Sequence, residues 1–166
     1  TLVKESAVTK RIKGEAKILR ALAYFTLVNY YSPSPTSGVN QEYGVPLVLG
    51  NYDVLIQPAR ATVAEVYDQI IKDLTEGMNQ TSNTTTKVTL GADAAKLLLS
   101  RVYLTRRAAG DAQLALQYAT EVIDNAPTGS FKSSTIVNAD NYINYFRGQD
   151  DSYSEKHPET IWELDL

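Results

Sequence analysis

The chain has 166 residues, enough to bury one sizeable core, so we expect a single domain. Its formal net charge is -3 at pH 7, and its 16 Lys+Arg are scattered among 19 Asp+Glu without a basic run, which excludes nucleic acid as a partner. It contains no cysteine, which excludes disulfides, thiolate chemistry and cysteine-based zinc sites and leaves the redox compartment open.

The two ends of the chain are typical of a piece of a longer protein. The opening residues, TLVKESAVTK, have neither an initiating Met nor the basic and apolar regions of a signal peptide. The closing residues, ETIWELDL, stop within a strand-like apolar alternation without a turn or a polar tail. No apolar run reaches the roughly 18 residues that a membrane-spanning helix needs. We therefore expect a fragment without such a helix.

A first helix is predicted over residues 6–31. From Ile18 to Tyr31 nearly every helical face is apolar or aromatic, so we expect a central helix that other elements cover on all sides. The small side chains of Ala16, Ala21 and Ala23 would admit close neighbours, and aromatic ones would fill the wider gaps. The early apolar stripe is Val8, Ile12, Ala16, Leu19 and Ala23, and the aromatic residues are Tyr24, Phe25, Tyr30 and Tyr31.

A long loop follows over residues 32–62, rich in Pro, Gly, Ser and Asn, which end helices and make turns. Within it Val45–Leu49 is apolar and is expected to lie against the core as an extended piece, because about thirty structureless residues are uncommon in a compact domain. Long loops on a rigid scaffold often carry function, so this loop is a functional candidate.

A second helix is predicted to begin at Thr62, because Thr62 and Glu65 have the spacing of a capping box. Its apolar residues lie on one stripe, Val63, Val66, Ile70, Leu74 and Met78. A polar connection over residues 79–90 leads to a third helix over residues 91–109. That helix is again apolar on most faces and is expected to be central.

A fourth, one-faced helix is predicted over residues 112–125, after a turn at Gly110 and Asp111 and before Pro127. The tail, residues 126–166, is irregular, with a possible short helix around Tyr142–Phe146 and an extended segment at Ile161–Leu164.

An internal repeat links the first and third helices. Lys17-Ile18-Leu19 with Tyr24 and Thr26 matches Lys96-Leu97-Leu98 with Tyr103 and Thr105 at constant spacing. Each apolar helix is followed by an amphipathic one, which is the plan of stacked helical hairpins. We therefore predict an all-α fold of tetratricopeptide-like helical hairpin repeats in one domain, residues 1–166, with helix pairs at about 6–79 and 91–125.

With these elements in order, the sequence resembles the SusD/RagB family, the surface-exposed glycan-binding lipoproteins of Bacteroidetes nutrient-uptake systems. The resemblance covers nearly the whole chain. The segments that carry it, in the family's order, are GEAKILRALAYFTLVNYYS, YGVPLVL, RATVAEVYDQIIKDLTEGM, AAKLLLSRVYL, ALQYATEVID and PETIWEL.

The resemblance implies an α-helical fold of tetratricopeptide-like pairs and no catalysis. It implies capture of an oligosaccharide for a TonB-dependent, SusC-like outer-membrane transporter, by a protein lipid-anchored at the cell surface. It also implies that this chain is mainly the scaffold and the transporter-facing part, since family members are much longer. No cofactor is implied.

Sugar binding needs flat aromatic faces for the apolar side of a pyranose ring, with amide and carboxylate groups for its hydroxyls. In the long loop Tyr43 and Tyr52 lie near Asn51 and Asp53, and these four residues are the ligand-binding candidates. The competing interpretation is that loop tyrosines simply pack against the fold.

Other chemical candidates favour structural roles. Trp162, in an alternating apolar segment, is expected to pack in the core. The acidic cluster Asp150, Asp151 and Glu155 lacks the spacing of a calcium loop, and we interpret it as a solvated turn. His157, the only histidine, cannot make a two-histidine metal site, so neither a metal nor a catalytic apparatus is expected.

Arg20 and Arg101 lie on the two apolar helices and would each need a carboxylate partner if buried. We expect structural ion pairs there, with partners from the second helix, namely Glu65, Asp68 or Asp73.

An alternative function stays open beside glycan binding. A tetratricopeptide-type module binds a peptide partner in the groove between its first and third helices, and the predicted fold would suit that role too. An enzyme is the third alternative, but no acid is placed beside a base.

Overall fold

The computed structural model describes residues 6–50, 53, 55, 57–83, 88–124 and 160–162. These residues form four α-helices and contain no strand: α1 (Ala7–Tyr31), α2 (Val63–Gln80), α3 (Ala92–Arg106) and α4 (Asp111–Asp124). The predicted all-α fold of tetratricopeptide-like helical hairpins is confirmed.

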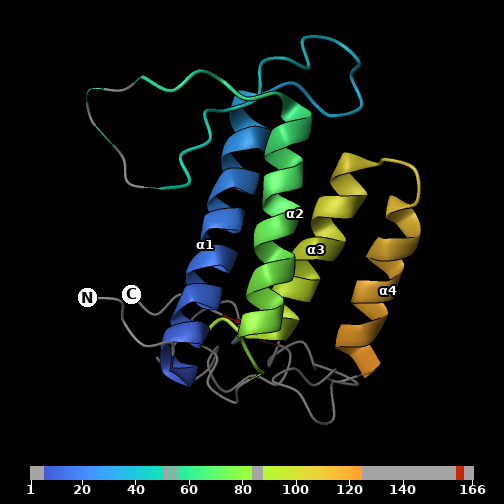
Figure 1. Cartoon of the computed structure of the whole chain (residues 1–166). Coiled ribbons are helices and arrows are strands. Elements are labelled where there is room, and N and C mark those ends of the chain that lie inside the picture. The colour runs from blue at the N-terminus through green and yellow to red at the C-terminus, as the bar shows by residue number, and fades with distance from the viewer. Residues whose placement is uncertain are drawn as a thin grey trace, which may run out of the picture.

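The four helices stand side by side and alternate in direction, as Figure 1 shows, with the long loop above the α1–α2 end. Helix α2 packs against both α1 and α3, whereas α4 contacts α3 alone among the four helices. Two antiparallel hairpins, α1–α2 and α3–α4, therefore stack through α2 and α3, as in a helical repeat array.

The helix ends follow from local side-chain chemistry. Thr62 caps α2 as predicted, because its hydroxyl accepts from Glu65 N at 3.2 Å while Glu65 Oε2 accepts from Thr62 N at 2.8 Å. Helix α3 ends at Arg106, three residues before the predicted end. Arg107 adopts a left-handed conformation with φ of 57°, which stops the helix there.

Helices α1 and α2 approach closely where two glycines meet. A Cβ atom on Gly77 would lie 2.6 Å from Ile18 Cγ1 and 2.9 Å from Gly14 O, so neither helix has room for a side chain at this crossing. Ile18 and Ala21 are fully buried beside it. Glycines and one alanine, rather than the predicted set of alanines, set the interhelical distance.

The expectation that the two apolar helices are covered on all sides is wrong for the described residues. In α1 the buried face carries Gly14, Ile18, Ala21, Tyr24, Phe25 and Val28. Several large apolar side chains lie exposed on the rest of these helices, namely Val8, Ile12, Leu19 and Leu27 on α1 and Leu97 and Leu104 on α3. The apolar run of each helix therefore spans two faces, and its hairpin partner covers only one of them.

The internal repeat is confirmed by an ion pair that recurs in each hairpin. Lys17 Nζ lies 2.8 Å from Glu76 Oε2 between α1 and α2, and Lys96 Nζ lies 3.0 Å from Glu121 Oε2 between α3 and α4. Matching lysines of the repeated sequence therefore each form an ion pair with a glutamate in the second half of the partner helix.

The turn between α3 and α4 is organised by Asp111, a buried carboxylate at the start of α4. Asp111 accepts from Arg106 Nε at 2.9 Å, from Arg106 Nη2 at 2.8 Å and from Ala108 N at 2.7 Å. The bonds from Arg106 are the main reason that the pKa of Asp111 is lowered. Arg106 also lies over the ring of Tyr103, 5.3 Å from its centroid, and that ring stacks on Tyr118.

Candidate functional site

The long loop between α1 and α2 is closed at its base by two backbone hydrogen bonds. Val63 N donates to Gln41 O at 2.9 Å, and Ala61 N donates to Val45 O at 3.2 Å. Residues 41–45 are thereby fixed against the start of α2, and the rest of the loop divides into two parts.

We name these parts the first lobe, residues 32–40, and the second lobe, residues 46–60. The first lobe is held from inside by Gln41, whose Nε2 donates to three acceptors, Ser34 O at 3.0 Å, Ser37 Oγ at 3.0 Å and Val39 O at 3.1 Å. In Figure 1 the two parts of the loop extend in different directions from the shared ends of α1 and α2. The described residues of the loop therefore form two lobes at the ends of α1 and α2.

Helix α1 fastens the start of the second lobe. The Tyr24 hydroxyl accepts from Val48 N at 2.7 Å and donates to Val48 O at 3.1 Å, and Arg20 Nη1 donates to Leu49 O at 3.2 Å. Val45 is buried, so the predicted extended piece does begin against the core, while Leu49 is exposed. The scaffold thus sets where this lobe leaves the fold.

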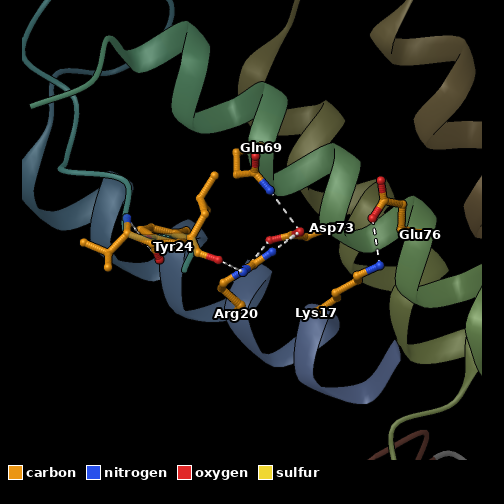
Figure 2. A network of polar contacts seen from close by, with 8 residues as sticks. Lys17, Arg20, Tyr24, Gln69, Asp73 and Glu76 are labelled. Carbon is orange, nitrogen blue, oxygen red and sulfur yellow. Dashed lines mark hydrogen bonds and ion pairs between the residues drawn. The ribbon is translucent and has the colours of Figure 1, made fainter. Parts of the chain in front are cut away.

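Arg20 connects that contact to α2, as Figure 2 shows. Its Nε and Nη2 atoms each lie 2.7 Å from an oxygen of the buried Asp73 carboxylate, which also accepts from Gln69 Nε2 at 2.9 Å. The hydrogen bonds with Asp73 are the largest cause of the raised pKa of Arg20. The expected structural ion pair of Arg20 is confirmed, whereas Arg101 is exposed and so does not require a carboxylate partner.

A second arginine, Arg60, binds backbone carbonyl groups at the base of the loop. Its Nε donates to Gly44 O at 2.6 Å, and its Nη2 donates to Tyr31 O at 2.6 Å and approaches Tyr43 O at 3.5 Å. Arg60 is not among the residues predicted from the sequence. The only signal for it was a lone basic residue in a Pro- and Ala-rich segment directly before the capping box at Thr62.

Two of the four predicted ligand-binding residues lie within the described part of the loop. Tyr43 is exposed and its N–H donates to Asn40 O at 3.0 Å, while Asp53 Oδ1 accepts from Leu55 N at 2.9 Å in a local turn. No hydrogen bond or ion pair joins Tyr43 to Asp53 in the described residues. The other two, Asn51 and Tyr52, lie outside the described residues.

The last two residues of α1 differ from the prediction. Tyr30 and Tyr31, expected to fill gaps in the core, are 79% and 67% exposed. With 3.6 residues per turn, Tyr30 lies on the opposite side of α1 from the buried Phe25 and Val28. Only Arg20, Thr26 and Asn29 interrupt the apolar run from Ile18 to Tyr31, and these three polar residues did not distinguish the two faces in the sequence. Tyr30 and Tyr31 are therefore exposed at the end of α1, where the loop begins.

Two open grooves run beside the first half of α2, and Asp68 lines both. The groove toward the second lobe has a volume of about 570 Å³ and is lined by Leu47, Ala59, Arg60, Ala61, Glu65, Asp68, Gln69 and Lys72. The groove toward the first lobe has a volume of about 390 Å³. Carboxylate, amide and ammonium groups beside small apolar side chains suit a ligand rich in hydroxyls.

The remaining candidates add no chemistry to the described residues. Trp162 is partly buried against the core, as predicted. The acidic cluster and His157 lie outside the described residues, and the described ones hold no group of three potential metal ligands. None of the described helices combines the length and the apolar character needed to cross a bilayer.

Comparison with known proteins finds a SusD-like family model and SusD-like relatives. A SusD-like family model, described as "Starch-binding associating with outer membrane", matches residues 2–104. A SusD-like protein of Bacteroides ovatus is 34% identical over an alignment of 134 residues that covers 75% of this chain and 22% of that protein.

Solved structures are similar over nearly the whole chain. The crystal structure of a SusD superfamily protein from Bacteroides thetaiotaomicron matches with a TM-score of 0.80 and 28% identity, covering 99% of this chain and 33% of that one. A laminarin-binding SusD-like protein matches with a TM-score of 0.63 and 26% identity, covering 89% of this chain and 30% of that one. The chain thus spans about a fifth of the curated relative and about a third of each solved structure.

Proposed function

The chain belongs to the SusD-like family, and we propose on that basis that it is part of a non-catalytic oligosaccharide-binding protein of an outer-membrane uptake system. The observation that carries the proposal is the pairing of the family match with a similar solved structure that binds laminarin, a glucan. A protein of this kind holds its ligand without changing it, so it needs ligand contacts but no acid beside a base.

The two-lobed loop is the part of the chain that we propose as the glycan contact. Tyr43 and Asp53 are exposed on it, and Asn51 and Tyr52 complete the set that we propose to bind sugar. Tyrosine faces suit the apolar side of a pyranose ring, and amide and carboxylate groups suit its hydroxyls. The contacts of Arg20, Tyr24 and the loop base support the proposal, because a loop that is fixed at its base loses less entropy on binding.

We propose that the helical hairpins serve as the scaffold and as the surface that faces a TonB-dependent, SusC-like transporter. In this view residues 1–166 form one helical unit of the longer protein, which is lipid-anchored at the outer surface of the outer membrane. Exposed apolar side chains such as Leu19 on α1 and Leu104 on α3 are available for such a contact. Co-purification of the transporter with the protein from outer membranes would test this part.

The glycan part is tested with the full-length protein and a broad array of oligosaccharides. Ligands found on the array are then measured by calorimetry against the wild type and against a variant that replaces Asn51, Tyr52 and Asp53 with alanine. We expect binding to at least one class of oligosaccharide and weaker binding by the loop variant. Leu116→Ala is the control, since Leu116 is an exposed residue of α4 away from the loop, and it should bind like the wild type.

A peptide-binding tetratricopeptide module is the second candidate. The groove that supports it has a volume of about 340 Å³ and is lined by Leu22 of α1, by Leu97, Leu98 and Arg101 of α3, and by Ile161 and Trp162. Because a later segment of the same chain, residues 160–162, lies along this groove where a peptide would bind, we rank peptide binding below glycan binding. Recovery of a peptide partner that slows hydrogen exchange of the backbone amides of Leu97 and Leu98 would favour this candidate.

A further inference from the structure

One hydroxyl group on α1 binds both backbone polar groups of a single loop residue. The Tyr24 hydroxyl accepts from Val48 N at 2.7 Å and donates to Val48 O at 3.1 Å. In an antiparallel sheet the N–H and C=O of such a residue would both bond to one residue of the neighbouring strand. A hydroxyl can replace that neighbour, because it has one proton to donate and lone pairs with which to accept. Tyr24 therefore takes the place of a strand partner for Val48.

We propose that Tyr24 is the positioning residue of the second lobe, and that its hydroxyl holds the lobe in the conformation that binds oligosaccharide. The proposal rests on the glycan-binding function proposed above and assigns a part in it to a residue of the helical scaffold. Tyr24 does not touch the sugar, so its effect on affinity passes through the backbone of the loop.

The helical core holds the Tyr24 hydroxyl in place. Tyr24 is only 8% exposed, and its ring belongs to the hydrophobic core cluster. Arg20 lies one turn earlier on the same side of α1, as Figure 2 shows, and its Nη1 donates to Leu49 O at 3.2 Å. The buried Asp73 carboxylate engages two other nitrogen atoms of this guanidinium. The first hairpin thus holds two consecutive residues of the lobe from a packed surface.

These contacts set the span between the fixed points of the second lobe. At its far end the lobe is fixed where Ala61 N donates to Val45 O at 3.2 Å. With Val48 and the next residue held, the span between the fixed points is residues 50–60. Without these contacts it would be residues 46–60. A longer span admits more conformations, and their entropy must be lost when a ligand binds.

The same contacts set one wall of the larger groove beside α2. Leu47, the residue before Val48, is partly buried against the core and lines the groove of about 570 Å³. Gln69 and Lys72 of α2 also line this groove. A shift of the Val48 backbone would move Leu47 with it. The Tyr24 hydroxyl therefore fixes both the exit of the second lobe and the groove wall that the lobe provides.

The test compares Tyr24→Phe with the wild type in the full-length protein. The substitution removes one oxygen atom and leaves the ring in the core, so that Arg20 alone holds this end of the lobe. Val122→Ala is the control for stability, because Val122 is a buried residue near the end of α4, which lies at the opposite end of the helices from the loop in Figure 1. The probes are laminarihexaose, cellohexaose, xylohexaose and mannohexaose, together with the ligands found on the array above.

Tyr24→Phe should weaken glycan binding about tenfold, which corresponds to a binding-competent lobe that is populated about a tenth of the time. Hydrogen exchange of the Val48 amide should become faster. In the background with Asn51, Tyr52 and Asp53 replaced by alanine, Tyr24→Phe should cause little further loss, because the groups that it positions are gone. A merely stabilising tyrosine would cause the same loss in both backgrounds. Val122→Ala should lower the free energy of unfolding and bind glycan like the wild type.

The outcomes that overturn the proposal are distinct. A folded wild-type protein that binds none of the oligosaccharides contradicts the proposed function, and the positioning role with it. Glycan binding that is as tight in Tyr24→Phe as in the wild type contradicts the positioning role alone. Unchanged exchange of the Val48 amide would show that the hydroxyl does not hold the lobe. An equal loss of affinity in Val122→Ala, or the full tenfold loss in the alanine background, would show an effect of stability instead of position.

Discussion

Arg20 of α1 and Asp73 of α2 form a two-point ion pair, with Nε 2.7 Å from Oδ2 and Nη2 2.7 Å from Oδ1. The Asp73 side chain is 1% exposed. The same guanidinium donates to Leu49 O, so this pair joins the first hairpin to the loop that the hairpin supports. Figure 2 shows the loop contact and the interhelical contact converging on Arg20.

Arg20→Met should lower the free energy of unfolding by about 2–4 kcal/mol, because it leaves the buried Asp73 carboxylate without its guanidinium. Urea unfolding of the two proteins measures this difference. Lys17→Met is the control, because its partner Glu76 lies at the surface, and it should cause a much smaller loss. Equal losses in both variants would show that Asp73 does not depend on Arg20.

Ala21→Leu should destabilise the protein by about 1–3 kcal/mol, because Ala21 is fully buried between α1 and its neighbours and has no room for a larger side chain. Ala23→Leu, two residues away and exposed, should change the stability by no more than about 0.5 kcal/mol. Thermal or urea unfolding of this pair checks which face of α1 is covered. A larger loss in Ala23→Leu would reverse the assignment of the two faces.

Gly77→Ala should also destabilise, by about 1–3 kcal/mol, although alanine is the better helix former by about 1 kcal/mol. The new Cβ would lie 2.6 Å from Ile18 Cγ1, so α1 and α2 would have to separate. Gly50→Ala is the control, because a Cβ there meets nothing within 4 Å. A gain in stability for Gly77→Ala would mean that the two helices do not cross at this glycine.

Asp111 should make stability depend on acidity. Its pKa in the folded protein is lowered from 3.8, mainly by the hydrogen bonds from Arg106, with a further contribution from Ala108 N. A lowered folded pKa means that the unfolded chain takes up the proton first, so the contribution of Asp111 is complete above pH 3.8 and is lost as the pH falls below it.

The stability difference between the wild type and Asp111→Asn should therefore be largest above about pH 4 and shrink toward about pH 2. Urea midpoints measured across this range give the comparison. A difference that stays constant with pH would mean that the Asp111 carboxylate is not stabilised by Arg106 in its charged form.

Local sequence signals predicted most of the helical architecture. The capping pair Thr62 and Glu65 predicted the start of α2. The matching lysines Lys17 and Lys96 in the repeated sequence indicated two similar hairpins. The end of α3 was predicted too late. The sequence contains no Gly or Pro at Arg107, where the chain turns left-handed.

Burial was harder to predict than helicity. An apolar run such as Ile18–Tyr31 predicts a helix, but which side is covered depends on how α2 lies across it, and that contact was not visible in the run itself. The same gap affected the site. Tyr43 was found from the composition of the loop, whereas the contacts of Arg60 with Gly44 O and Tyr31 O became visible only in the folded structure.

The affinity of the full-length protein for oligosaccharides, measured by calorimetry on ligands found by array screening, tests the account most directly. We predict saturable binding of at least one oligosaccharide. Binding should weaken when the Asn51–Asp53 segment is replaced with alanine and stay unchanged in the scaffold variant Leu116→Ala. A correctly folded protein that binds no oligosaccharide would contradict the account. So would binding that is unchanged by every substitution in the loop but is abolished by Leu116→Ala.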